Sequence, residues 1–333
     1  MEQLVGDVKR AILVMYAASY APLWANASRS WASEYCFCEY IGSILAVGDT
    51  VTAPRNRRER PSSLQHQEYT SLAVLLEPLV KDDRQELLQW LWMKRTGRWS
   101  SSTSNLLLRF AARFGYGELM RTCVHVWGAT DIAGAVSVAA EVGQASIVLL
   151  CHKEWFSEMD VDAAMLYAAY GNQESIMRMC HTWGATHVNA AMGAAAASGH
   201  ATLVRICHDE WGAKDTPTAM AGAAQYGHET VVRMCHDDFG ARDNTDLNFT
   251  MAHAAARGHE HLVRLCHDEW GATDVNRAML SAAYGGHIAI VRLCLQWGAV
   301  QIREARRKAN SRGHAHIVDL CDAWLAEKQQ SST

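Results

Sequence analysis

Residues 273–299 read TDVNRAMLSAAYGGHIAIVRLCLQWGA, a pattern that predicts two short helices joined by a tight turn. Thr273 or Asp274 stands where an N-cap is expected, and apolar residues then follow with helical spacing. The glycine pair at 285–286 interrupts the first helix. A second apolar stripe follows and stops at Gly298, the position expected of a left-handed C-cap. This stretch therefore encodes one antiparallel pair of helices.

The same pattern recurs along most of the chain. One cysteine recurs in each copy at intervals of 27 to 31 residues: Cys123, Cys151, Cys180, Cys207, Cys235, Cys266, Cys294 and Cys321. An aromatic residue follows each of these cysteines by three or four residues. Self-similarity at such a period is typical of a solenoid, in which each repeat buries its apolar face against its neighbours. We therefore expect an all-α solenoid of helix pairs.

Composition fits an intracellular protein without a catalytic motif. The 333 residues are 49% hydrophobic and 20% charged, with a formal net charge of -4 that gives no general attraction to nucleic acid. The repeated cysteines fall on the inner stripe of a helix, so a reducing compartment, the cytoplasm, is the simplest setting. There is no phosphate-binding loop, no Gly-x-Ser-x-Gly and no HExxH, and we expect neither an enzyme nor a cofactor.

The repeated strings resemble the ankyrin repeat. AAYGGHIAIVRLCLQWGA at 282–299 and AAASGHATLVRICHDEWGA at 195–213 are similar to the ankyrin pattern AAxxGHxxIVxxLLxxGA. The resemblance covers eight repeats over residues 103–326, preceded by a degenerate capping repeat at 67–102. The next helix starts about five residues sooner than in an ankyrin repeat, and the TPLH turn is missing. The resemblance therefore implies an ankyrin-like solenoid whose hairpins are shortened or absent.

A Cys-His pair in five of the repeats raises the question of a metal or catalytic site. On a helical wheel, Cys266 points inward, His267 lies at the rim and Asp268 faces solvent. Zinc needs several thiolate or imidazole ligands that converge, and no CxxC motif is present. We therefore expect buried structural cysteines and no metal site.

The first helix of each repeat offers candidate partner-binding residues. In a stack of helix pairs the first helices line the concave face, and side chains outside their apolar stripe are free to contact a partner. Tyrosine and arginine are frequent anchors of protein interfaces. Ordinary surface variation is the alternative for each single residue. The candidates are Glu141, Tyr167, Tyr170, Tyr226, His253, Arg257, Arg277, Tyr284, Arg307 and Arg312.

Two charged surfaces are further candidates. Five basic residues, Arg303, Arg306, Arg307, Lys308 and Arg312, follow one another near the C-terminus and suit an acidic protein, whereas the lack of interleaved aromatic residues makes nucleic acid an unlikely partner. They also fit a solubilising end cap. Glu210 and Glu269, in the last turns of second helices, oppose the helix dipole and suggest an acidic docking ridge.

Residues 1–50 resemble an F-box. Leu4, Ile12, Leu13 and Trp31 fall in the order of the F-box pattern, although Val5 replaces its proline and the middle segment is weak. Two alternatives remain for these residues. Lys9-Arg10 and the apolar run behind them imitate a signal peptide, and the segment also suits a plain helical cap of the solenoid.

The remaining segments look like connections. Residues 51–66 read as a basic linker rich in proline and serine, in which the arginines between Arg55 and Arg60 resemble a nuclear import signal. Residues 327–333 are expected to form a disordered tail.

The two resemblances together imply an adaptor protein. An F-box ahead of ankyrin-like repeats implies a substrate-recruiting subunit of a cullin-type ubiquitin ligase, in which Leu4, Ile12, Leu13 and Trp31 dock the ligase's linker subunit and the repeats select a target. Chains of this style resemble ankyrin/F-box multigene families of large DNA viruses, which implies host proteins as partners. The alternative is a scaffold or competitive binder of a host protein with no ligase link. We expect a monomer that binds proteins and no membrane.

Overall fold

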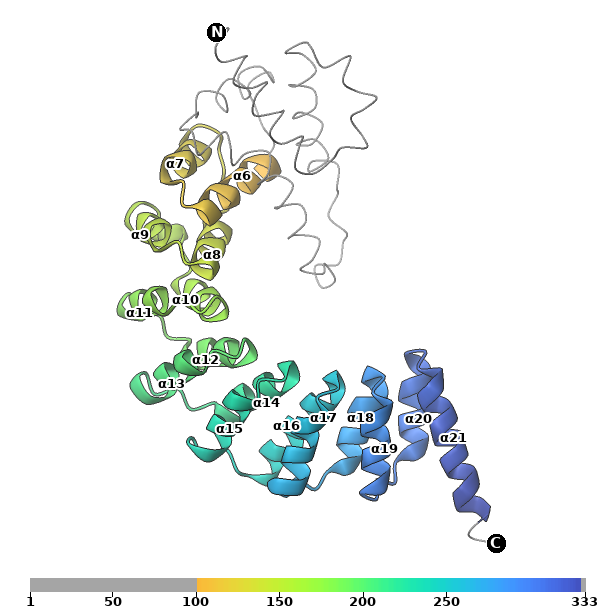
Figure 1. Cartoon of the computed structure of the whole chain (residues 1–333). Helices are drawn as coiled ribbons and strands as arrows, with labels where there is room; N and C mark the ends of the chain where they lie inside the picture. Colours follow the sequence, from red (N-terminus) through yellow and green to blue (C-terminus); the bar gives the residue numbers. More distant parts are fainter. Residues whose placement is uncertain (1–100, 331–333) are drawn as a thin grey trace, which may run out of the picture. The chain divides into compact units, whose positions relative to one another are not determined.

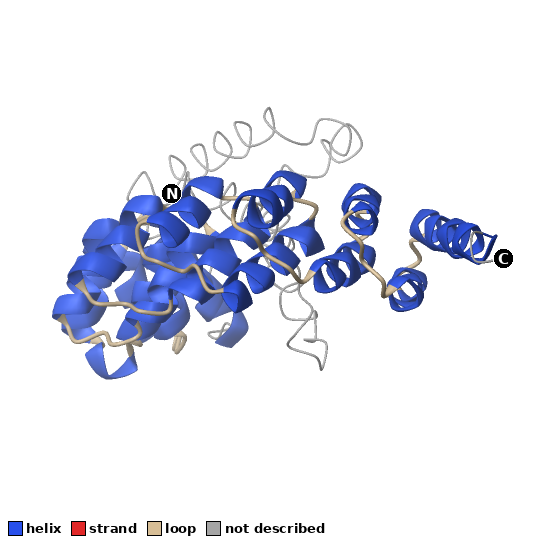
Figure 2. Cartoon of the chain, turned by 90° about the horizontal axis from the view of Figure 1, so that it is seen from below, coloured by secondary structure: helices blue, strands red, loops and turns tan. Residues whose placement is uncertain are grey.

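A computed structural model describes residues 101–330, and every regular element in this range is helical (Figures 1 and 2). The all-α prediction is confirmed for this part of the chain. The F-box-like segment, the basic linker and most of the capping repeat lie outside the described residues. No described helix is both long and apolar enough to cross a membrane.

The described residues fall into two compact bodies. The N-terminal body comprises residues 101–139 and 144–159 and contains α6 (Ser101–Phe114), α7 (Gly117–His125), most of α8 (Ile132–Val142), α9 (Ala145–Glu154) and a 3₁₀ turn at Phe156–Glu158. Within it, α7 packs against α6 and α9.

The C-terminal body comprises residues 140–143 and the chain from Asp160 onward. Its first helices are α10 (Val161–Tyr170), α12 (Val188–Ala197), α14 (Thr216–Tyr226), α16 (Asn244–Arg257), α18 (Val275–Gly285) and α20 (Ile302–Ser311). Its second helices are α11 (Glu174–Thr182), α13 (Ala201–Arg205), α15 (Glu229–Asp237), α17 (Glu260–Arg264), α19 (Ile288–Gln296) and α21 (Ala315–Gln330). Helices α13 and α17 continue into π-helical turns at Ile206–Glu210 and Leu265–Glu269.

The helix ends follow from local residues. The carboxylate of Asp274 accepts a 2.9 Å hydrogen bond from the backbone N–H of Arg277 and caps α18. Gly286, with φ 88°, ends that helix, and Gly298, with φ 90°, follows α19. The helix pair predicted for residues 273–299 is confirmed, with Asp274 as the cap.

Neighbouring helices pack in series. In the C-terminal body each first helix from α12 to α18 packs between the first helices before and after it, and each pairs with its own second helix (Figure 1). Small and flexible side chains fill the contact. Met165, Met192, Met220, Met251 and Met279 are all fully buried among alanines that let the helices approach closely.

Asparagine and aspartate side chains connect one repeat to the next. The Oδ1 atom of Asn189 accepts hydrogen bonds from the backbone N–H groups of Lys214 and Asp215, at 2.8 and 3.1 Å. Asp162, Asn248 and Asn276 bind the following repeat in the same way. These bonds satisfy backbone donors that the start of the next helix leaves unpaired.

The histidine of each Gly-His pair forms a second connection. The Nε2–H of His228 donates to the carbonyl oxygen of Ala197 at 3.0 Å, and His287 reaches Ala256 at 3.2 Å. His200, His259 and His314 make the equivalent bond. The N-terminus of each second helix from α13 to α21 is thus bonded to the C-terminal end of the first helix of the preceding repeat.

Two features differ from or refine the sequence expectations. No strand occurs between residues 101 and 330, so the connections between repeats are short irregular turns and no hairpin projects from them. The tail was predicted to be disordered from residue 327, whereas α21 continues to Gln330. The residues after Ala326 have good helix formers, and no glycine or proline stops the helix.

Candidate partner-binding surface

The ten candidate residues all lie on first helices or at their C-caps. Nine are exposed and His253 is half-buried. Among the aromatic candidates Tyr226 is the most exposed, at 54%, and Tyr170 and Tyr284 are each 45% exposed. Large apolar rings in water are the groups that gain most from a partner.

Arginines lie over aromatic rings at three consecutive contacts between first helices. The guanidinium carbon of Arg257 on α16 lies 6.0 Å from the ring centre of Tyr226 on α14. At the other end of the row, Arg312 lies 4.0 Å from the ring centre of Tyr284 on α18. The structure therefore brings four of the candidates together as two cation–π pairs.

The middle contact contains a residue that the sequence analysis missed. Arg277 on α18 lies 5.1 Å from the ring centre of Phe249, and His253 contacts the same ring edge-on at 4.4 Å. Burial, and then the charge of Arg277, lower the pKa of His253. Phe249 lies four residues before His253, which places both on one face of α16, and this spacing is the signal that identifies it.

The other four candidates take no part in the contacts between arginines and aromatic rings. Tyr167 and Tyr170 contact each other at 6.4 Å between ring centres. Arg307 pairs with Glu304 in its own helix. Glu141 lies exposed at the end of α8.

The three arginines over the rings have no carboxylate partner within the described residues. Most arginines on the second helices differ in this respect, Arg292 on α19 being an exception. Arg178 binds Glu210 at 2.6 Å, Arg205 binds Asp238 at 2.6 Å and Arg264 binds Glu260 at 2.8 Å. The first-helix face thus presents positive charge, while the second-helix face neutralises most of its own.

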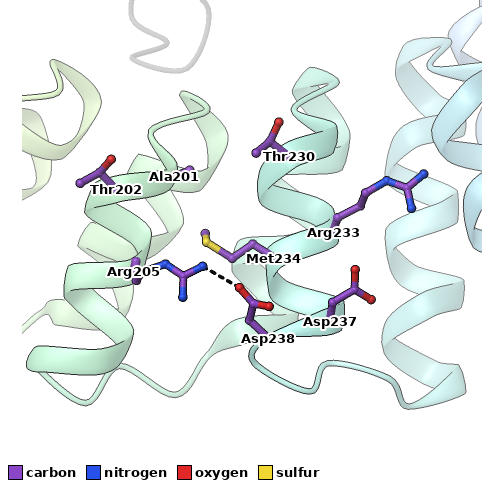
Figure 3. A pocket seen from close by; sticks show the side chains of 8 residues that line it. All are labelled: Ala201, Thr202, Arg205, Thr230, Arg233, Met234, Asp237 and Asp238. Carbon is purple, nitrogen blue, oxygen red and sulfur yellow. Dashed lines mark hydrogen bonds and ion pairs between the residues drawn. The ribbon is translucent and has the colours of Figure 1, made fainter.

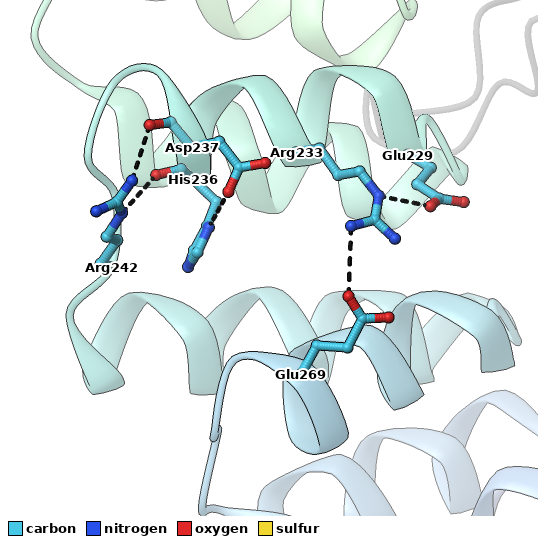
Figure 4. Close-up of polar contacts among 6 residues, drawn as sticks. All are labelled: Glu229, Arg233, His236, Asp237, Arg242 and Glu269. Carbon is cyan, nitrogen blue, oxygen red and sulfur yellow. Dashed lines mark hydrogen bonds and ion pairs between the residues drawn. The ribbon is translucent and has the colours of Figure 1, made fainter.

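The acidic ridge expected on the second helices does not present free acids. Glu269 lies 3.5 Å from Arg233, which also binds Glu229 at 2.8 Å (Figure 4). The other acid of the proposed ridge, Glu210, accepts from Arg178, and this hydrogen bond lowers the pKa of the Glu210 carboxyl. Both acids connect neighbouring repeats, a role that the sequence spacing within one helix does not reveal.

A cleft of about 450 Å³ lies on the second-helix face between α13 and α15 (Figure 3). Its lining mixes Thr202, Thr230 and Met234 with two arginines and two aspartates. The ion pair between Arg205 and Asp238 crosses it. Arg233 pairs with Glu229 and Asp237 with His236, so every charged side chain of the lining already has a partner.

The Cys-His pairs belong to the packing of the repeats. All eight repeat cysteines are buried, and burial raises the pKa of Cys266 and Cys294 to about 12. Four of the five histidines stack on the aromatic residue of the next repeat, as His236 does on Trp270 at 3.9 Å, whereas His152 contacts Phe156 edge-on. Among residues 101–330 no three His, Cys, Asp or Glu side chains are placed to hold a metal ion.

The predicted ligase-docking residues Leu4, Ile12, Leu13 and Trp31 lie outside the described residues. No model of a known protein family and no curated protein matches the sequence.

Proposed function

We propose that this chain is a protein-binding module built from ankyrin-like helix-pair repeats that form a solenoid. The repeated Gly-His and Cys-aromatic columns, the serial packing of helix pairs and the bonds between repeats all support this architecture. Such a scaffold holds its first helices at fixed spacing, so their exposed side chains form one preorganised surface.

The observation that carries the proposal is the set of exposed tyrosines on first helices. Tyr167, Tyr170, Tyr226 and Tyr284 are four of the large hydrophobic side chains that the described residues leave in water. Tyrosine loses little conformational entropy when it is buried, and it supplies a large contact area together with a polar hydroxyl. The first-helix face is therefore the surface that binds a protein target.

Affinity capture followed by binding measurements tests this function. The full chain is used as bait, captured proteins are identified by mass spectrometry, and the affinity of a purified candidate is measured. The Tyr226→Ala/Tyr284→Ala variant is expected to lose about tenfold or more in affinity, as buried aromatic anchors do. Val300→Ser removes an apolar side chain that is 77% exposed in a connecting turn and serves as the control. Equal binding by the tyrosine variant and the native chain would reject the proposed surface.

The proposal extends to a substrate adaptor of a cullin-type ubiquitin ligase, in which residues 1–50 dock the ligase and the repeats bring the target. Its support is the F-box-like order of Leu4, Ile12, Leu13 and Trp31. Purified full chain should bind the ligase's linker subunit, and Ile12→Asp should abolish this binding while target binding persists. A folded chain that binds its target and not the linker subunit is instead a scaffold or competitive binder.

A further inference from the structure

We propose that the first-helix face of α14 to α20 binds an acidic, extended protein segment, recognised by arginines that aromatic rings hold in place. This inference rests on the proposed protein-binding function and names the chemistry of the partner.

The arginine arrangement repeats from helix to helix. In each case the arginine comes from the later first helix and reaches back over a ring of the earlier one: Arg257 over Tyr226, Arg277 over Phe249 and Arg312 over Tyr284. A ring under the flat face of a guanidinium leaves the N–H groups at its edge free to donate hydrogen bonds. The three side chains are thus oriented without being neutralised.

The charge of this face is positive. Besides the three arginines over rings, Arg303 and Lys308 lie on α20, while Arg307 and Glu304 of that helix pair with each other. The other acids are Asp246 in the first turn of α16 and the N-cap residues Asp215, Asp243 and Asp274, all at the opposite helix ends from Arg257 and Arg312. The whole chain has a net charge of -4, so the positive face reflects a separation of charge between the two layers of helices.

Carboxylates fit these arginines better than a nucleic acid does. A guanidinium edge matches a carboxylate with two parallel hydrogen bonds. Single-stranded nucleic acid needs aromatic faces on which bases stack, whereas the rings of Tyr226, Phe249 and Tyr284 each have an arginine over one face. Flanking apolar residues of a protein segment can cover the ring surface that remains exposed.

The spacing indicates an extended segment. Arg257 ends α16 and Arg312 caps the same end of α20, so the two stand two first helices apart. With neighbouring helices about 8–10 Å apart, the arginines are separated by roughly 16–20 Å, about six residues of extended chain. Acidic residues about six positions apart would therefore meet Arg257 and Arg312. Arg277 lies in the first turn of α18, toward the other end of the helix between them, so a third acid must come from a part of the partner that lies to one side of this line.

Selection from a displayed library of random 12-residue peptides tests the inference on the full chain. Peptides that bind are expected to be rich in Asp and Glu, and a synthetic copy of one should bind about tenfold or more tightly than its Asn/Gln counterpart. The Arg257→Gln/Arg277→Gln/Arg312→Gln variant should lose a similar factor, and rising salt should weaken binding of the native chain.

The matched control removes the same charge from the second helices. The Arg178→Gln/Arg264→Gln/Arg292→Gln variant should bind the acidic peptide within about twofold of the native chain, since rim charges far from the contact contribute little. Circular dichroism and thermal unfolding of both variants establish that they are folded.

The outcomes separate this inference from the proposed function. If the selected peptides are neutral or basic and their binding requires Tyr226 and Tyr284, the inference of an acidic partner is wrong, whereas the proposed protein-binding surface stands. Selected peptides that bind equally well without these tyrosines would count against both. Displacement of the acidic peptide by a single-stranded oligonucleotide that binds more tightly and depends on the three arginines would assign the face to nucleic acid and overturn the inference.

Discussion

The imidazole of His267 lies nearly parallel to the indole of Trp297, with ring centres 3.8 Å apart and 13° between the planes. His208 on Phe239 and His181 on Trp211 repeat this contact at 3.8 and 4.5 Å. The histidine of four of the five Cys-His pairs therefore belongs to the interface between two repeats.

A double-mutant cycle measures that contact. His267→Ala and Trp297→Ala are each expected to destabilise the chain, and their effects should fall short of additivity by about 0.5–1.5 kcal/mol, the coupling of a stacked ring pair. Urea unfolding of the two single variants and the double variant supplies the free energies. Additive effects would show that the rings do not stabilise each other.

Gly285 is predicted to admit no larger side chain. A Cβ atom there would lie 2.3 Å from the carbonyl oxygen of Ala256 on the preceding first helix, so Gly285→Ala must push two repeats apart. We expect a loss of about 1–3 kcal/mol in the free energy of unfolding, as in other overpacked contacts.

Gly193 provides the matched control in the interior of α12. A Cβ atom there meets nothing within 4 Å, and alanine removes the conformational freedom that glycine has in the unfolded chain. Gly193→Ala should therefore stabilise the protein by about 0.5–1 kcal/mol. Equal stability losses in both variants would contradict the packing of Gly285 against α16.

The repeat cysteines should be unreactive in the folded protein. Burial raises the pKa of Cys207 and Cys235 to about 12, so almost none of either thiol is ionised at pH 8. A maleimide or disulfide reagent should label the repeat cysteines only as fast as the chain unfolds. Cys36 and Cys38 lie outside the described residues and are replaced by serine in this experiment.

An added exposed thiol calibrates the labelling. Val300→Cys places a thiol at a position where the native side chain is 77% exposed. This thiol should be labelled much faster than the buried cysteines. Stoichiometric labelling of the repeat cysteines at that rate, without denaturant, would show that the cysteine column is open to solvent.

Stability should depend on pH through His253. The folded chain lowers the pKa of this histidine below its usual 6.5, so the unfolded chain binds the proton at a higher pH than the folded chain does. The stability that neutral His253 contributes is present above pH 6.5 and is lost as the pH falls through it. His287, whose pKa is also lowered by burial, acts in the same direction.

His253→Gln should reduce this loss. Thermal unfolding between pH 7.5 and pH 5.5 avoids the range in which most carboxylates titrate. The melting temperature of the native chain should fall over this interval, and that of the variant should fall less. An identical decrease in melting temperature in both proteins would show that His253 does not cause the pH dependence.

Much of the fold follows from local sequence because each repeat encodes its own helix ends. Asp274 and Gly298 mark the ends of one helix pair, and the cysteine column marks its buried stripe. The exposed tyrosines were predicted for the same reason, since a helical wheel separates the two faces of one helix.

Contacts between repeats were harder to predict. A wheel indicates that His267 leaves the core, but the side chain that meets it comes from the next repeat, 30 residues away. For the same reason the pairing of Glu269 with Arg233 and the position of Arg277 over Phe249 were not anticipated. Such partners depend on the rotation between neighbouring repeats, which spacing within a helix does not contain.

The asparagine bonds between repeats bear on how such a chain evolves. The Oδ1 atom of Asn276 binds backbone N–H groups of Val300 and Gln301, which nearly any residue at those positions would supply. The spacing between neighbouring repeats thus depends on main-chain atoms of the following repeat and little on its side chains. Outward side chains can mutate without altering that spacing, so new ligand preferences can arise while the framework persists.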